Sequence, residues 1–259
     1  MTVTSPRLGV VFRPQLPPEQ LRPFVTSAQA AGLDDVWLWE DCFLEGGLTA
    51  SVAALAWTES VRVGLGLMPV PFRNPALAAM ELATVARLFP GRFVPAAGHG
   101  VLDWMAQVGA RAESPMTLLR EWVSAVRALL HGETVTTAGS YVNLAEVALD
   151  WPPSSVPPLL VGARKPRTIA LAGEHADGLV LDAGITPDGV RAAIAQAAAP
   201  RPHEVVVYLP VGGSADDLAE LVRGYGEAGA TTVVLQPTET ALEIDPLISV
   251  AAETRAKLG

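Results

Sequence analysis

The sequence contains little that would tie it to a disulfide framework, a nucleic acid or a membrane. Its 259 residues include one cysteine, Cys42, which excludes an internal disulfide. Lysine and arginine number 18 against 27 aspartate and glutamate residues, so the formal net charge of -9 provides no basic surface for nucleic acid. No apolar run has transmembrane length and no signal peptide is recognisable. These absences predict a cytoplasmic protein that binds a small molecule.

Several motifs with well-known chemistry are also missing. No spacing of His, Cys, Asp and Glu suggests a metal site, and there is no nucleophile elbow. No G-x-G-x-x-G opens a helix, which argues against a dinucleotide-binding open sheet. Neither a low-complexity segment nor a Ser/Gly linker divides the chain, so we expect residues 1–259 to form a single domain.

Residues 61–100 show the unit from which the chain is built. An apolar strand is predicted at residues 63–69 and a second one at residues 93–98. The helix between them is signalled by Asn74 as the N-cap and by Pro75 at the first helical position, where a missing N–H costs nothing. Both strands are nearly continuous apolar runs, as expected for parallel strands that are covered on both faces.

This strand-and-helix unit repeats eight times. The predicted strands cover residues 8–12, 36–39, 63–69, 93–98, 158–162, 178–182, 204–209 and 232–236. A long helix from Ser114 to Gly132 precedes an exposed hairpin at residues 134–144, which is inserted before the fifth strand. Eight βα units favour a single (β/α)8 TIM barrel over an open doubly wound sheet.

The active site of such a barrel lies at the carboxyl ends of the strands. The side chains that directly follow the strands are therefore the candidates for function. They are Arg13, Glu40, Asp41, Cys42, Met68, Pro69, His99, Gly162, Ala163, Arg164, Lys165 and Asp182.

Several segments together resemble the bacterial luciferase-like monooxygenase family, which includes FMN-dependent monooxygenases and oxidoreductases that use the deazaflavin coenzyme F420. The matching segments are WLWEDCF, NPALAAMELATVARLFPGR, SPMTLLREWVSAVRALLHGE with its GSYVNL hairpin, and PPLLVGARKPRTIALAGEHADG. The resemblance implies a (β/α)8 fold and an F420-dependent enzyme that transfers a hydride to or from a small organic substrate. An FMN-dependent monooxygenase and a non-catalytic cofactor-binding protein are the alternatives. Family members commonly form dimers, so a homodimer is expected.

The resemblance places the cofactor phosphate at Gly162, Ala163, Arg164 and Lys165. The chemistry of these residues agrees, because a glycine-containing turn at a helix N-terminus offers free N–H groups. Arg164 and Lys165 add positive charge. The alternative interpretation is a solvated basic pair at an ordinary βα turn.

The resemblance also assigns cofactor contacts to Gly66, Leu67 and Gly98. Gly66 and Leu67 align with a bulge where family members have a non-prolyl cis peptide behind the flavin ring, so we expect the Gly66–Leu67 bond to be cis. Gly98 ends the neighbouring strand. The alternative is that Gly64 and Gly66 merely allow close packing of their strand.

The family's usual proton-transferring residues are replaced in this chain. Cys42 follows Asp41 where relatives often have a histidine, and Val101 stands where one F420-dependent relative has a catalytic glutamate. We predict that His99 replaces them, with Asp41 as a partner, because an unperturbed histidine titrates near neutrality. His99 could instead only hydrogen-bond the backbone. Cys42 is a weak proton donor, a substrate contact or, as lone cysteines most often are, a small hydrophobe.

Overall fold

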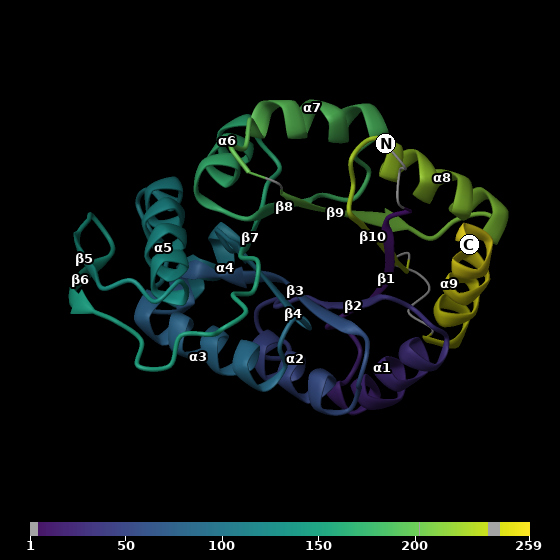
Figure 1. Cartoon of the computed structure of the whole chain (residues 1–259), viewed down its shortest axis with the longest axis horizontal. Coiled ribbons are helices and arrows are strands. Elements are labelled where there is room, and N and C mark those ends of the chain that lie inside the picture. The colour runs from purple at the N-terminus through teal and green to yellow at the C-terminus, as the bar shows by residue number, and fades with distance from the viewer. Residues whose placement is uncertain (1–4, 202, 238–243) are drawn as a thin grey trace.

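A computed structural model of the chain describes residues 5–201, 203–237 and 244–259, and its centre is a closed barrel of eight parallel strands (Figure 1). The order around the barrel is β1-β10-β9-β8-β7-β4-β3-β2. The strands are β1 Arg7–Phe12, β2 Asp35–Leu38, β3 Arg62–Pro69, β4 Phe93–Gly98, β7 Leu160–Gly162, β8 Gly178–Leu181, β9 Glu204–Pro210 and β10 Thr232–Gln236. The predicted TIM barrel is confirmed, and the open sheet is excluded.

Helices surround the barrel and cover the outer face of its strands (Figure 1). The main helices are α1 Leu21–Ala30, α2 Gly47–Ala56, α3 Pro75–Leu88, α5 Pro115–Leu130, α6 Pro166–His175, α7 Pro187–Ala197, α8 Ala215–Glu227 and α9 Ile244–Leu258. Shorter helical segments are η1 Pro18–Gln20, η2 Val70–Phe72 and α4 Leu102–Gln107. Asn74 and Ser114 cap α3 and α5 as the sequence predicts, because their side chains accept hydrogen bonds from N–H groups of the first turn.

Three details of the chain path differ from the predicted one or extend it. The fifth barrel strand, β7, begins at Leu160 rather than at residue 158. The preceding Pro157 and Pro158 lack a backbone N–H, so they cannot donate a hydrogen bond to a neighbouring strand. The predicted hairpin is formed by β5 Val135–Ala138 and β6 Asn143–Val147, an antiparallel pair outside the barrel (Figure 1). The short helix α4 is not predicted, because its six residues are too few to show the hydrophobic periodicity of a helix.

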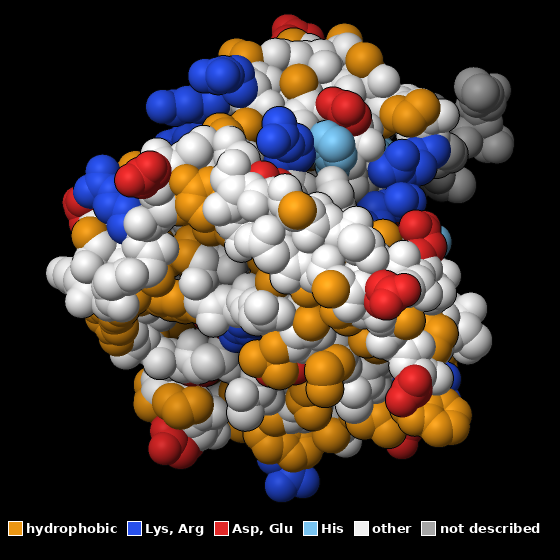
Figure 2. Space-filling model, turned by 90° about the vertical axis from the view of Figure 1, so that its left-hand side faces the viewer, with side chains coloured by type: hydrophobic (Ala, Val, Ile, Leu, Met, Phe, Trp, Pro, Cys, Tyr) orange, Lys and Arg blue, Asp and Glu red, His pale blue; other side chains and the backbone are white. Residues whose placement is uncertain are grey.

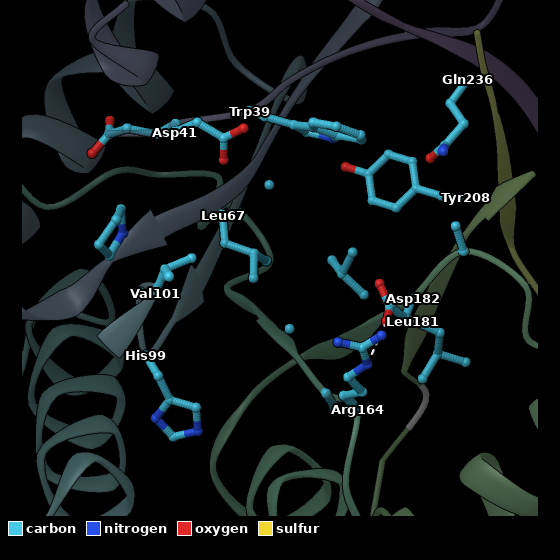
Figure 3. A pocket seen from close by; sticks show the side chains of 18 of the residues that line it. Trp39, Asp41, Leu67, His99, Val101, Arg164, Leu181, Asp182, Tyr208 and Gln236 are labelled. Atoms are coloured by element: carbon cyan, nitrogen blue, oxygen red, sulfur yellow. Dashed lines mark ion pairs between the residues drawn. The ribbon is translucent and has the colours of Figure 1, made fainter. Parts of the chain in front are cut away.

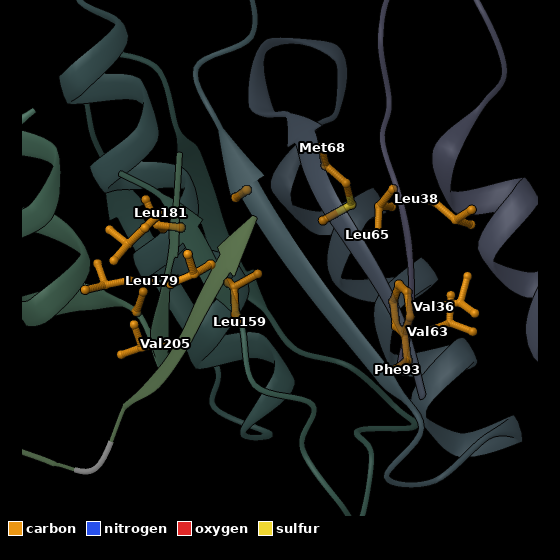
Figure 4. Close-up of a cluster of buried hydrophobic side chains, with 14 of the residues drawn as sticks. Val36, Leu38, Val63, Leu65, Met68, Phe93, Leu159, Leu179, Leu181 and Val205 are labelled. Carbon is orange, nitrogen blue, oxygen red and sulfur yellow. The ribbon is translucent and has the colours of Figure 1, made fainter. Parts of the chain in front are cut away.

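The apolar side chains form two layers. The larger layer lies between the strands and the helices and includes Val36, Val63, Leu179 and Val205, some of which are drawn in Figure 4. The smaller layer fills the barrel interior with Val11, Trp37, Val94, Ala96, Leu160, Val180, Val206, Tyr208 and Val234. The indole of Trp37 occupies the space beside Gly64, where an added Cβ would collide with the ring. Close packing therefore explains Gly64.

Surface composition varies around the barrel. Figure 2 shows the side that carries α5 and the hairpin, and apolar side chains gather on its lower part, where α3 lies. Leu77, Met80 and Leu88 of α3 are exposed there, whereas Leu82 faces the core. Among the residues that the structure describes, no helix combines the length and apolarity needed to cross a bilayer.

Charged side chains close the amino end of the barrel. Asp35 at the start of β2 is buried and accepts hydrogen bonds from Arg62 at 2.9 Å and 3.1 Å and from Arg7 at 2.7 Å. Arg62 also reaches Glu204 and Thr232 at the starts of β9 and β10. This network joins five strands, β1, β2, β3, β9 and β10, at the end opposite the predicted active site.

We expect the variant Asp35→Ala to lower the free energy of unfolding by about 3 kcal/mol, because Arg62 loses its main partner while remaining buried. Urea denaturation followed by circular dichroism measures this change. Asp188→Ala is the control, since Asp188 pairs with Arg191 at 2.6 Å on the exposed surface of α7. Equal effects of the two substitutions would contradict a structural role for the Asp35 network.

Candidate functional site

A cavity of about 550 Å³ opens at the carboxyl ends of the barrel strands (Figure 3). Its walls come from seven strand ends and the loops that follow them, so residues distant in sequence share one space. The predicted site residues that line it are Asp41, Gly66, Leu67, His99, Gly162, Ala163 and Arg164. Cys42, Gly98 and Lys165 are not on its wall.

Leu67 projects into the cavity from an irregular point of β3. The pairing of β3 with β4 shifts register between Gly66 and Met68, and the Gly66–Leu67 peptide bond is cis, as predicted. The side chain of Leu67 lies against Gly98 and Gly162, where added Cβ atoms would collide with it. Gly98 therefore contributes through the room it leaves for Leu67. The result is an apolar floor that crosses three strand ends.

The turn between β7 and α6 forms another part of the wall. Ala163 donates its N–H to the carbonyl oxygen of Val180, which continues the pairing of β7 with β8. Arg164 forms an ion pair of 2.6 Å with Asp182, and both side chains line the cavity (Figure 3). Lys165 is the N-cap residue of α6 and its side chain makes no capping bond. The turn thus brings a guanidinium and a helix N-terminus to the cavity.

The loop after β2 carries the carboxylates. Arg73 donates to both oxygens of Glu40, at 2.6 Å and 2.9 Å, and Glu40 also accepts the N–H of Gly47 at 2.9 Å. Glu40 is therefore held in a fully partnered position. Burial raises the pKa of Asp41 above its ordinary value, although the charge of Arg13 opposes this effect. Glu40 and Asp41 both line the cavity.

Cys42 follows Asp41 but does not share its position on the cavity wall. Burial raises the pKa of its thiol, and the negative charges of Glu40 and Asp41 add to the effect, so the thiol stays protonated at neutral pH. The Cys42–Phe43 bond is a second non-prolyl cis peptide, which the sequence does not predict.

His99 sits at the junction of β4 and α4 and is tied to the backbone. Its Nδ1 donates to the carbonyl oxygen of Pro115 at 3.2 Å, which leaves Nε2 as the nitrogen that titrates. Burial lowers the pKa of His99, and the hydrogen bond to Pro115 opposes this shift. At neutral pH the imidazole is therefore predominantly neutral, and Nε2 can accept a proton.

Two polar residues of the site are missed by sequence reasoning. Tyr208 on β9 and Gln236 at the end of β10 both line the cavity. The ring of Tyr208 meets Trp39 edge-on with 5.4 Å between centroids, and burial raises the pKa of its hydroxyl. Within the described residues, neither that hydroxyl nor the buried indole nitrogen of Trp39 makes a hydrogen bond of ordinary geometry, although interaction with the Trp39 side chain opposes the rise in the pKa of Tyr208. A lone tyrosine inside the apolar strand EVVVYLP was the available signal.

The described residues contain no group of three or more His, Cys, Asp or Glu side chains arranged to hold a metal ion. The cavity brings the ionisable side chains of Asp41, His99 and Tyr208 together with Arg164 and the apolar surface of Leu67.

The chain resembles proteins of known family and activity. A model of the luciferase-like monooxygenase family matches residues 2–225. The chain is 26% identical over 242 residues to a 5,10-methylenetetrahydromethanopterin reductase of Methanolobus tindarius, which covers 88% of this chain and 73% of the relative. It is 30% identical over 183 residues to an F420-dependent glucose-6-phosphate dehydrogenase of Kineococcus radiotolerans, which covers 66% of this chain and 54% of the relative.

A solved structure shares the whole fold. The structure of an F420-dependent secondary alcohol dehydrogenase in complex with an F420-acetone adduct superposes with a TM-score of 0.86. The superposition covers 98% of this chain and 99% of that chain at 18% sequence identity. At this identity the likeness establishes a common barrel architecture.

The loop that carries Asp41 also contains a carboxyl group suited to a pH test. Both oxygens of Glu45 are buried without a hydrogen-bond partner among the described residues, and burial raises its pKa from the ordinary 4.5 to about 7. Because the folded state holds this proton more tightly than the unfolded state, the folded state loses stability as the pH rises from 4.5 to about 7.

We expect Glu45→Gln to stabilise the protein at pH 8, where wild-type Glu45 is charged, and to have a smaller effect at pH 5. The measurement is the free energy of unfolding in urea at both pH values. Glu19→Gln, at an exposed position in η1, is the control. A gain for Glu45→Gln that is the same at both pH values would rule out titration as its cause.

Proposed function

The chain belongs to the luciferase-like monooxygenase family, and on that premise we propose that it is an oxidoreductase that uses coenzyme F420 to transfer a hydride to or from a small organic substrate. Its relatives are named as a reductase and a dehydrogenase, and the dehydrogenase is named as F420-dependent. The observation that carries the proposal is that the apolar floor at Leu67 and the basic turn before α6 belong to one cavity.

The residues present fit a flavin-type cofactor. Leu67, held between Gly98 and Gly162, offers an apolar surface for a flat ring. The N-terminus of α6, together with Arg164 and Lys165, suits a phosphate group. The unpartnered polar atoms of Tyr208 and Trp39 suit the polar edge of a bound ring or substrate. When bound, reduced F420 supplies the hydride.

The chain's own residues orient the reactants and handle the proton. Trp39, Val101 and Trp104 line the cavity with apolar surface that excludes water from the reacting groups. The Nε2 atom of His99 takes or releases the proton that accompanies hydride transfer, and the bond from Nδ1 to Pro115 holds the ring in place. Asp41, whose pKa is raised by burial, is the second group at which a proton can reside.

The proposal is tested with purified protein in two assays. Fluorescence titration compares the binding of F420 and FMN. Anaerobic oxidation of reduced F420 is then followed across a panel of ketones, enones and quinones, beside oxygen uptake with reduced FMN. Substrate-dependent oxidation of reduced F420 is the expected result. Substrate-dependent oxygen uptake with FMN alone would establish a monooxygenase instead, and tight binding without turnover of either cofactor would establish a non-catalytic binding protein.

We expect His99→Asn to slow hydride transfer about 100-fold, because general acid–base catalysis contributes effects of this size or larger. Asparagine can still donate to the carbonyl oxygen of Pro115, so affinity for the cofactor should be retained. Turnover of reduced F420 and the fluorescence titration provide the two measurements.

The control for this variant is His131→Asn. His131 makes the same kind of bond, from Nδ1 to the carbonyl oxygen of Arg127 at 2.8 Å, but lies on the surface at the end of α5. If His99→Asn and His131→Asn turned over at similar rates, the proton would be handled elsewhere.

A further inference from the structure

The ion pair between Arg164 and Asp182 results from strand register. Gly162 is paired with Val180 in the parallel ladder of β7 and β8. Arg164 lies two residues after Gly162, and Asp182 lies two residues after Val180. The Nε atom of Arg164 is 2.6 Å from the Oδ2 atom of Asp182. The alignment of the two strands therefore places a carboxylate at the turn that would hold the cofactor phosphate.

This carboxylate is not needed to stabilise the barrel. The side chains of Arg164 and Asp182 are 80% and 49% exposed, and exposed ion pairs contribute little to stability. Its effect is instead on the charge of the cavity wall. Asp182 neutralises the guanidinium of Arg164, so the positive charge of the cavity wall at this turn is reduced to that of the α6 N-terminus.

The other charged groups of the cavity wall do not offset Asp182. Glu40 is already paired with Arg73, and Asp41 carries the same sign of charge as Asp182. His99 is predominantly neutral at neutral pH because burial lowers its pKa. The wall is therefore poorly suited to a ligand group with two negative charges.

We propose that Asp182 determines cofactor preference at this turn, because its charge favours a singly charged phosphodiester over a doubly charged phosphomonoester. F420 carries a phosphodiester, whereas FMN carries a phosphomonoester that is a dianion above about pH 6. At the turn itself, Coulomb repulsion scales with the charge of the phosphate group, so Asp182 opposes the phosphomonoester dianion about twice as strongly as the phosphodiester monoanion. The inference rests on the proposed function, because it takes the turn at residues 162–165 as the phosphate site.

The test is cofactor binding to the Asp182→Asn variant, measured by fluorescence titration at pH 8 with no turnover required. Asparagine keeps the size of the side chain and an oxygen that can accept from Arg164, so the turn should retain its shape. We expect about tenfold tighter binding of FMN, about threefold tighter binding of F420 and no change for riboflavin, which has no phosphate. The gain for FMN should shrink as salt is added.

Asp188→Asn is the matched control, because Asp188 also pairs with an arginine at 2.6 Å but lies on the exposed surface of α7. It should change none of the three affinities. The inference is overturned if Asp182→Asn does not increase the affinity for FMN relative to that for riboflavin. This includes the case in which FMN binds neither the wild-type protein nor the variant. Failure of the wild-type protein to bind F420, with the gain for FMN intact, would instead reject the proposed function and leave the role of Asp182 standing.

Discussion

Closure of the barrel is the constraint on which the rest of the structure depends. The pairing of β1 with β10 joins the first and last strands of the barrel, with Arg7 opposite Thr232 and Val10 opposite Leu235. Each barrel strand therefore has a neighbour on both sides, and no edge is left with unpaired backbone groups. Closure also brings all eight strand ends to one rim, where Trp39 and Tyr208 meet although 169 positions separate them in the sequence.

Asp35 at the amino end of the barrel and Tyr208 and Trp39 at its carboxyl end differ in how their polar atoms are partnered. At the amino end, the carboxylate of Asp35 is fully partnered by Arg62 and Arg7. At the carboxyl end, the hydroxyl of Tyr208 and the indole N–H of Trp39 are buried without partners among the described residues. Buried polar groups are rarely left unpaired without a functional reason. This contrast agrees with a stabilising network at one end and a binding site at the other.

Charge is distributed within the cavity so that each ionisable group has a distinct role. Glu40 is held by Arg73, while burial raises the pKa of Asp41 beside it. His99 is kept predominantly neutral by burial and can act as a base at Nε2. Asp182 limits the positive charge at the turn before α6. These ionisable groups lie on different strand ends and reach the cavity together, whereas Cys42 does not line it.

The sequence by itself determined the parts of this protein that depend on neighbours along the chain. Runs of apolar residues predicted the strands, Asn74 and Ser114 marked helix starts, and the resemblance correctly placed the cis bond at Gly66–Leu67. Hydrophobic periodicity and helix capping depend on residues that are close together in the sequence. They can therefore be recognised without knowledge of the tertiary fold.

The tertiary structure alone decided which side chains share the cavity. It keeps Cys42 and Lys165 off the cavity wall, adds Tyr208, and pairs Arg164 with Asp182. These outcomes depend on the register between strands and on the path of each loop. A shift of one residue would turn every side chain of a strand to its other face, and no local pattern specifies that alignment.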